Sequence, residues 1–195
     1  MSGIGVFNIL LWFALGYRHW RRVSDDPHWA RYWRLQWVLS GVYVLGCAAE
    51  STHRQISQMP DFTVTAARES GARAFAAAGV SPSDIDVVEL YDAFTINTIL
   101  FLEDLGFCEK GEGGAFVEGG RIAPGGGLPV NTNGGGLSCV HPGMYGIFTV
   151  IEATRQIRGD APGLQIANVD LALAHGNGGT LSSQVTAILG SENTL

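Results

Sequence analysis

The sequence is poor in cysteine and in positive charge. Its three cysteines, Cys47, Cys108 and Cys139, form no C-x-x-C pair and no Cys/His cluster, so neither a disulfide framework nor a metal site is indicated. Lysine and arginine together number 12 against 18 aspartate and glutamate residues, which gives a formal net charge of −6. This balance argues against nucleic acid as a partner, and scattered thiols are typical of a protein of the reducing cytoplasm.

Long apolar runs are also missing. The first 17 residues carry no charge, but a membrane-spanning helix needs about 20 apolar residues. A signal peptide would need a basic start and a small-residue cleavage site, and neither is found. We therefore expect no membrane insertion and a cytoplasmic protein. A surface-associated amphipathic helix and an atypical leader are the main alternatives for this segment, and a membrane span is the less favoured third.

Composition changes near residue 41. Residues 1–40 hold all five tryptophans and five arginines against two aspartates, whereas the remaining residues hold seven basic against sixteen acidic side chains. A chain of 195 residues has room for one domain and a short appendage. We expect a Trp/Arg-rich leader over 1–41 and one domain over 42–195.

The domain alternates strand and helix patterns. Short apolar runs typical of strands cover 42–50, 85–90, 169–180 and 181–189. Helix patterns cover 61–79, 92–106 and 144–159. We expect Asp61 and Asp92 to be N-caps and Gly79 a C-cap. In the last helix, apolar Ile147, Val150, Ile151 and Ile157 lie near one face. This order predicts the α/β class.

Glycine is concentrated between positions 106 and 146, where 14 of the 27 glycines lie. A long irregular stretch inside a compact domain is usually functional. Its densest part reads NTNGGGLSCVHPGMYG at 131–146, with Gly134, Gly135 and Gly136 in a row. Glycine lacks the Cβ that blocks a close approach to the backbone. We therefore predict that a ligand binds over these three residues.

Two histidines and one tyrosine stand where strands and helices meet. His141 precedes the last helix, and His175 ends an apolar strand; glycines flank both. An imidazole in such a place can exchange a proton near neutral pH or stabilise an oxyanion. A plain role in capping the backbone is the alternative for each histidine. Tyr91 ends the buried strand of 85–90, where its hydroxyl can donate a hydrogen bond.

Three stretches resemble, in order and spacing, the C-terminal motifs of the thiolase superfamily: VELYDAF at 88–94, NTNGGGLSCVHPGMYG at 131–146 and ALAHGNGG at 172–179. They look most like the lipid-transfer-protein (sterol carrier protein) type and its bacterial acetyl-CoA acetyltransferase relatives. The resemblance covers residue 42 to the end. It implies a thiolase-like C-terminal half, a mixed sheet packed with helices, that is incomplete relative to the two-half thiolase fold.

The resemblance also implies roles for single residues. Tyr91 stands where thiolases hold an oxyanion-hole water with an asparagine. His141 matches the histidine that activates the nucleophile and contacts the thioester oxygen, and Pro142 and Gly143 would help to bind the substrate. His175 replaces the acid/base cysteine. Gly176 follows it, and the backbone N–H of Asn177 takes an oxyanion-hole place.

The implied activity is that of an acyltransferase of the acetyl-CoA C-acyltransferase type. It would act on acyl-CoA or 3-ketoacyl-CoA thioesters in lipid or steroid metabolism, as a homodimer and without a bound cofactor. However, no cysteine precedes residue 42, so the thiolase nucleophile is absent. It could come from a partner chain, or the chemistry could need none.

Two further hypotheses remain open. Some thiolase-fold enzymes without the cysteine perform retro-aldol cleavage of a β-hydroxyacyl-CoA together with an OB-fold partner. Tyr91 fits their pattern, whereas His141 occupies the position of their second catalytic tyrosine. The last hypothesis is a non-catalytic fragment that binds thioesters or serves dimerisation.

Overall fold

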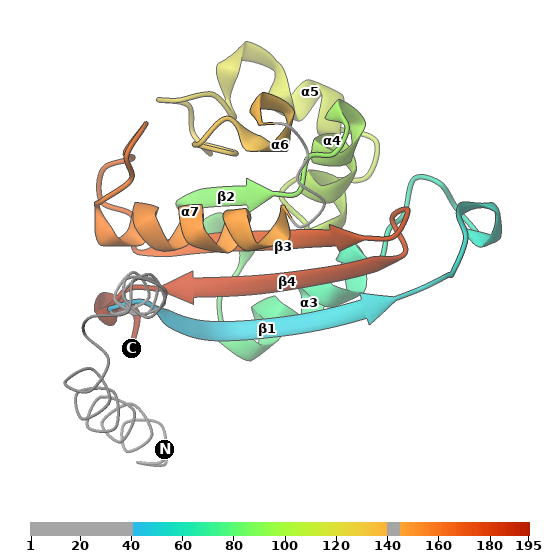
Figure 1. Ribbon diagram of the computed structural model, residues 1–195, viewed down its shortest axis with the longest axis horizontal. Coiled ribbons are helices and arrows are strands. Elements are labelled where there is room, and N and C mark those ends of the chain that lie inside the picture. The colour runs from blue at the N-terminus through green and yellow to red at the C-terminus, as the bar shows by residue number, and fades with distance from the viewer. Residues whose placement is uncertain (1–40, 140–144) are drawn as a thin grey trace, which may run out of the picture. The chain divides into compact units, whose positions relative to one another are not determined.

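The computed structural model describes residues 41–139 and 145–195, and Gly41–Leu195 forms one compact unit (Figure 1). Its centre is a four-stranded sheet with the strand order β1-β4-β3-β2. The strands are β1 (Tyr43–Ser51), β2 (Val87–Leu90), β3 (Leu171–Gly178) and β4 (Ser183–Gly190). β2 and β3 are parallel, whereas β4 runs antiparallel to both β1 and β3. The expected α/β class with a mixed sheet is therefore confirmed.

Helices cover both faces of this sheet (Figure 1). α3 (Ala67–Ala78) and α4 (Thr95–Asp104) pack on one face, and α7 (Gly146–Arg158) packs on the other. The remaining helices are short: α5 (Gly113–Val117), α6 (Gly135–Ser138), and the 3-10 turns η1 (Ile56–Gln58), η2 (Pro82–Asp84), η3 (Glu118–Gly120) and η4 (Glu192–Thr194). Among the described residues, no helix combines the length and apolarity needed to cross a membrane.

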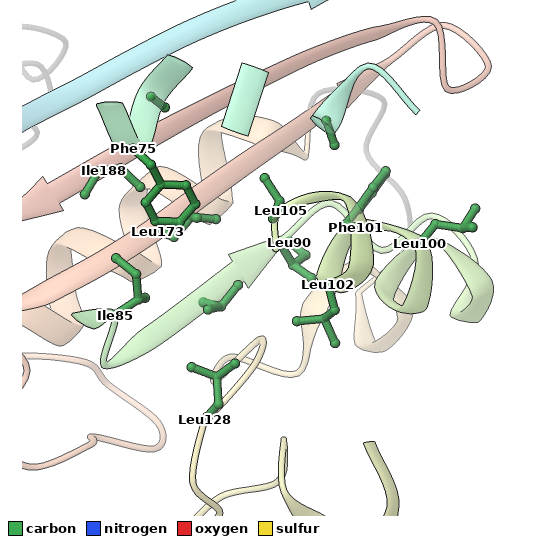
Figure 2. Packing of buried hydrophobic residues seen from close by; sticks show 13 residues of the cluster. Phe75, Ile85, Leu90, Leu100, Phe101, Leu102, Leu105, Leu128, Leu173 and Ile188 are labelled. Carbon is green, nitrogen blue, oxygen red and sulfur yellow. The ribbon is translucent and has the colours of Figure 1, made fainter. Parts of the chain in front are cut away.

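The two faces have separate hydrophobic cores because successive side chains of a strand point to opposite sides. The larger core lies under α3 and α4, where Leu90, Leu173 and Ile188 of the sheet meet Phe75 and Phe101 (Figure 2). The smaller core lies under α7 and consists of Val87, Ala153, Val169, Ala172, Ala174 and Leu189. Three of these six residues are alanines.

The outer edge of β2 is closed by the chain itself. The backbone N–H of Val88 donates to the carbonyl of Pro129 at 3.0 Å, and the N–H of Asn131 donates to the carbonyl of Val88 at 2.9 Å. Val88 and Val130 form an isolated parallel bridge. The segment that leads into the glycine-rich loop is therefore bonded to the sheet.

Both predicted N-caps are wrong. α3 begins at Ala67, and the Asp61 carboxylate instead accepts hydrogen bonds from the N–H and the hydroxyl of Thr63, at 2.8 and 2.7 Å. Asp61 can satisfy its acceptor within a local turn, so it does not start the helix. α4 begins at Thr95, and Asp92 bonds elsewhere, as described below. Gly79 is the C-cap of α3 with φ of 72°, as predicted.

The inner face of α7 follows the predicted apolar face only in part: Val150 and Ile157 pack against the smaller core, but polar residues share this face. Ile147 is 55 % exposed, whereas Thr149, Glu152 and Gln156 are buried. The reason lies in the sheet, because α7 covers the side of β2 from which Glu89 projects. Polar side chains on the helix thus meet a polar side chain of the strand.

Candidate functional site

The candidate site lies where the parallel strands β2 and β3 end. Leu90 and His175 are paired across these strands, and the N–H of Tyr91 donates to the carbonyl of His175 at 3.0 Å. The loop of residues 131–136 and the start of α7 reach the same end. Ligands tend to bind at the carboxyl ends of parallel strands in α/β folds.

The glycine run is turned against a carboxylate of the chain itself. Gly134 and Gly135 have φ of 90° and 69°, which a residue with a Cβ rarely adopts. A Cβ on Gly135 would overlap Asp92 Oδ2, and one on Gly136 would lie 3.0 Å from Asp92 Oδ1. The N–H of Gly136 donates to Asp92 Oδ1 at 2.5 Å. Asp92 is thus one group that the bare backbone admits, and ligand binding over the three glycines stays a prediction.

Two asparagines hold the shape of this loop. Asn131, with φ of 53°, accepts a hydrogen bond from the N–H of Leu90 at 2.6 Å through Oδ1. Asn133 Oδ1 accepts from the N–H of Gly135 at 2.8 Å and from the hydroxyl of Tyr145 at 3.2 Å. Our sequence reasoning missed both. The signal was present, because asparagine beside glycine is typical of turns in which side chains bond to the backbone.

Two tyrosines pack against each other beside the loop. The rings of Tyr91 and Tyr145 meet edge to face, with centroids 5.5 Å apart. Both are buried, and burial together with the charge of Asp92 raises the pKa of Tyr145. A Cβ added to Gly146 would lie 3.8 Å from the Cα of Gly176 and 3.9 Å from the Tyr91 ring. The structure therefore brings together three predicted parts of the site: Tyr91, the glycine run and Gly176.

The imidazole of His175 lies on the opposite face of the sheet. It is fully buried, and its ring packs against Phe101 with centroids 4.7 Å apart. Nδ1 lies 2.9 Å from the hydroxyl of Thr186, and Nε2 lies 2.7 Å from Gln184 Oε1. Burial lowers the pKa of His175 to about 4. The ring is therefore neutral at neutral pH.

The hydrogen bonds around His175 assign its tautomer. The amide oxygen of Gln184 can only accept, so Nε2 carries the proton and Nδ1 accepts from Thr186. Because the proton of Thr186 goes to His175, the hydroxyl of Ser70 in α3 donates to Thr186 Oγ1 at 2.9 Å, and Gln184 donates to Asn177 Oδ1 at 3.0 Å. This polar chain fixes the side chain of Asn177. An acid/base role of His175 stays a prediction, and it requires one of the two ring bonds to open.

A buried acidic pair was not anticipated from the sequence. Glu89 of β2 and Glu152 of α7 both lie within hydrogen-bond distance of the hydroxyl of Thr132. Glu89 has no exposed surface, and burial raises its pKa from 4.5 to about 8. One feature of the sequence could have indicated the pair: Glu89 is a charged residue inside a strand whose pattern predicts burial on both faces.

The other predicted site residues cannot be placed. His141, Pro142 and Gly143 lie outside the described residues, so the convergence of the two imidazoles stays a prediction. Across 41–139 and 145–195, no group of three or more His, Cys, Asp or Glu side chains could hold a metal ion.

Comparisons with known proteins agree on one family. The family model "Thiolase C-terminal domain-like" matches residues 48–191. The chain is 41 % identical over 145 residues to the acetyl-CoA acetyltransferase of Methanothermobacter thermautotrophicus, a match that covers 74 % of this chain and 37 % of that protein. It is 38 % identical over 142 residues to sterol carrier protein 2 of Oryctolagus cuniculus, covering 72 % and 26 %. The chain thus spans well under half the length of these curated relatives.

A solved structure shares the fold. The Ltp2-ChsH2(DUF35) aldolase matches with a TM-score of 0.69 and 32 % sequence identity, over 79 % of this chain and 40 % of the matched chain. The matched proteins thus carry the names of a transferase, a lipid carrier and an aldolase.

Proposed function

Because the chain belongs to the thiolase C-terminal domain family, we propose that it works on coenzyme A thioesters as one half of an acyltransferase. The reaction would be of the acetyl-CoA C-acyltransferase type, with 3-ketoacyl-CoA substrates of lipid or steroid metabolism. No cysteine precedes residue 42. In the proposal, the nucleophilic cysteine therefore lies outside these 195 residues, and a partner chain is one source of it.

The observation that carries this proposal is the loop of residues 131–136. The side-chain oxygens of Asn133 and Asp92 accept from its N–H groups, and Asn131 Oδ1 ties it to the N–H of Leu90 at the carboxyl end of β2. Acyl transfer needs fixed donors aimed at the oxygen that becomes negative in the transition state. In the proposal, this loop supplies a fixed shape beside Tyr91, and the donors come from other groups, because the N–H groups of Gly135 and Gly136 already donate to Asn133 and Asp92.

Each predicted residue has a place in the proposal. His141 activates the nucleophile and binds the thioester oxygen, and Tyr91 donates to an oxyanion. The backbone N–H of Asn177 supplies a second donor, and the chain from His175 through Gln184 keeps Asn177 in position. His175 also exchanges a proton, if the bond to Thr186 or Gln184 opens.

The test restores a complete enzyme. The chain is co-expressed with a thiolase N-terminal half that carries the nucleophilic cysteine, and CoA-dependent cleavage of a 3-ketoacyl-CoA is measured. We expect His141→Ala to abolish cleavage, because the base and the oxyanion donor are then lost. His53→Ala is the matched control, since this imidazole bonds the carbonyl of Thr180 in the turn between β3 and β4 and has no part in the proposed chemistry. An unchanged rate in His141→Ala would reject the assignment.

A retro-aldol reaction is the second candidate, and one observation favours it. The ring centroids of Tyr145 and Tyr91 are 5.5 Å apart, so two phenol side chains lie together at the site. This holds even though His141 occupies the position of the second catalytic tyrosine of those enzymes. The aldolase with 32 % identity adds support. Release of an aldehyde or a ketone from a β-hydroxyacyl-CoA, with an OB-fold partner present, would select this reaction. If calorimetry detects no acyl-CoA binding, only the non-catalytic fragment remains.

A further inference from the structure

Two buried carboxyl groups compete for one hydroxyl proton under α7. Thr132 Oγ1 lies 2.7 Å from Glu89 Oε1 and 2.8 Å from Glu152 Oε1. A threonine hydroxyl carries a single proton, which it can donate in only one direction. If both carboxyl groups were ionised, one of these two short oxygen–oxygen distances would have no proton between the atoms.

One additional proton accounts for both short distances from Thr132 Oγ1. With a proton on one carboxyl group, that group donates to Thr132 Oγ1 while the hydroxyl of Thr132 donates to the other. The second lone pair of Oγ1 accepts from Gln156 Nε2 at 2.9 Å, and the other amide proton of Gln156 goes to the carbonyl of Leu164 at 2.6 Å. Every short distance around Thr132 is then a hydrogen bond.

The surroundings favour this extra proton. Glu89 is fully buried, Glu152 is 4 % exposed, and Glu89 Oε2 has no hydrogen-bond partner among the described residues. The other titratable groups that act on this cluster are Asp92, after β2, and Tyr145, before α7; neither is a cation. Burial and the two neighbouring carboxylates raise the pKa of Glu89 to about 8.

We propose that Glu89 and Glu152 share one proton at neutral pH, and that this protonated pair is a positioning device for the loop of residues 131–136. Thr132 lies between Asn131 and Asn133, the two side chains that fix the loop. The proton count stands on the geometry alone. The catalytic meaning of the positioned loop rests on the proposed function.

Loss of the shared proton has a direct structural consequence. Two carboxylates then face the same hydroxyl in a site without a neighbouring cation, and like charges at this distance repel strongly when buried. The repulsion acts between β2 and α7 and releases Thr132 from one of its partners. The loop then loses its anchor, and the bond from the N–H of Gly136 to Asp92 weakens.

The first test detects the proton itself. Infrared spectroscopy of the wild-type chain at pH 7 is expected to show the carbonyl band of a protonated carboxylic acid, and Glu89→Gln is expected to remove it. The unfolding equilibrium constant of the wild type rises about tenfold from pH 6.5 to pH 8, and that of Glu89→Gln stays constant. Asp104→Asn is the control, since this buried carboxylate is paired with Lys110, and it keeps the wild-type response. A missing band, or a band that persists in Glu89→Gln, overturns the proposal.

The second test measures loop position. Hydrogen exchange of the Gly135 and Gly136 amides is followed above pH 8, after correction for the intrinsic rate. We expect fast exchange in the wild type and protection in Glu89→Gln, whose amide replaces the acid as a donor. Thr132→Val exposes both amides at every pH, whereas Thr132→Ser keeps them protected at neutral pH. Equal exchange in all four proteins would refute the positioning role.

A third measurement separates this inference from the proposed function. Acyl-CoA binding by the wild-type chain is measured at pH 7 and at pH 9 by calorimetry. Binding that weakens at pH 9 in the wild type and not in Glu89→Gln supports the link to function. Equal binding at both pH values overturns that link. Absence of binding at both refutes the proposed function, while the proton and the exchange rates are judged on their own.

Discussion

Each face of the sheet buries a titratable side chain, but the hydrogen-bond partners of the two side chains differ. On the α3/α4 face, His175 lies in a chain of neutral hydroxyl and amide groups that uses both ring nitrogens. On the α7 face, Glu89 meets a second glutamate across one hydroxyl. Burial favours the neutral form of each group, so the pKa of His175 is lowered and that of Glu89 is raised.

This difference separates acid sensitivity from alkaline sensitivity within one domain. His175 must gain a charge when the chain is acidified, and Glu89 must gain one when it is made alkaline. On the α3/α4 face, both ring nitrogens of His175 have hydrogen-bond partners when the ring is neutral. On the α7 face, the hydrogen bonds of Thr132 to the two glutamates require one additional proton. The two faces are thus distinguishable by pH alone.

The largest expected effect breaks the α7 face. Gly135→Ala places a Cβ into Asp92 at a φ of 69°, and we expect a loss of about 4 kcal/mol in the free energy of unfolding. Denaturant unfolding measures it. Gly111→Ala is the matched control, because its φ is 92° but nothing lies within 4 Å of the new Cβ. Equal losses in both variants would show that backbone strain alone, and not the contact with Asp92, is responsible.

The corresponding change on the α3/α4 face is His175→Ala. It leaves a cavity and two polar partners without a bond, for which we expect a loss of about 3 kcal/mol. At His175, the folded chain binds fewer protons than the unfolded chain between pH 4 and pH 6.5. The contribution of His175 to stability therefore falls as the pH falls through this window. Thermal unfolding of Glu89→Gln from pH 4 to pH 7, where the opposite trend of Glu89 is absent, measures this contribution, and adding His175→Ala should remove it.

Glu89 gives the opposite trend. Between pH 4.5 and about pH 8 the folded chain keeps a proton that the unfolded chain has lost. Its contribution to stability falls as the pH rises, by at most about 1.4 kcal/mol per pH unit. Where the two windows overlap, the trends cancel, so we expect a plateau below pH 6.5 and a decline above it. Glu89→Gln should remove the decline, and a decline that remains would contradict the comparison.

The smallest expected effect tests how far the polar chain of His175 extends. Ser70→Ala removes the hydroxyl that supplies Thr186, and one buried hydrogen bond is worth about 1 kcal/mol. The acid trend of His175 persists in this variant, because both ring nitrogens keep their partners. Unfolding at pH 5 and pH 7, measured in the Glu89→Gln background where the opposite trend of Glu89 is absent, checks both statements. A loss of the acid trend would mean that Ser70, rather than burial, controls the imidazole.

Local patterns were sufficient for most of the fold. The apolar runs and Gly79 predicted β1–β4 and the end of α3, because short-range signals decide these elements. The N-caps failed at Asp61 and Asp92, whose carboxylates found other N–H donors. Whether a carboxylate caps a helix depends on which N–H group it accepts from. For Asp92 this is the N–H of Gly136, 44 positions along the chain.

The site was predictable as a set of segments rather than as an arrangement of side chains. Tyr91, the glycine run and Gly176 lie close together at one end of the sheet, while their roles stay predictions. The sequence could not predict on which face of the sheet the His175 side chain lies. Both faces of β3 carry apolar residues, so the hydrophobic pattern does not distinguish them. Glu89 and Glu152 were missed for a related reason, since their pairing depends on a contact between β2 and α7.

The backbone bonds between residues 129–131 and β2 have a thermodynamic consequence for any ligand. A mobile loop that closes over a ligand loses conformational entropy, and this loss makes the free energy of binding less favourable. Here the main chain before the glycines is already an extension of the sheet. If a thioester binds at this surface, as proposed, the backbone there is already ordered in the free protein. We therefore expect only a small loss of protein conformational entropy on binding.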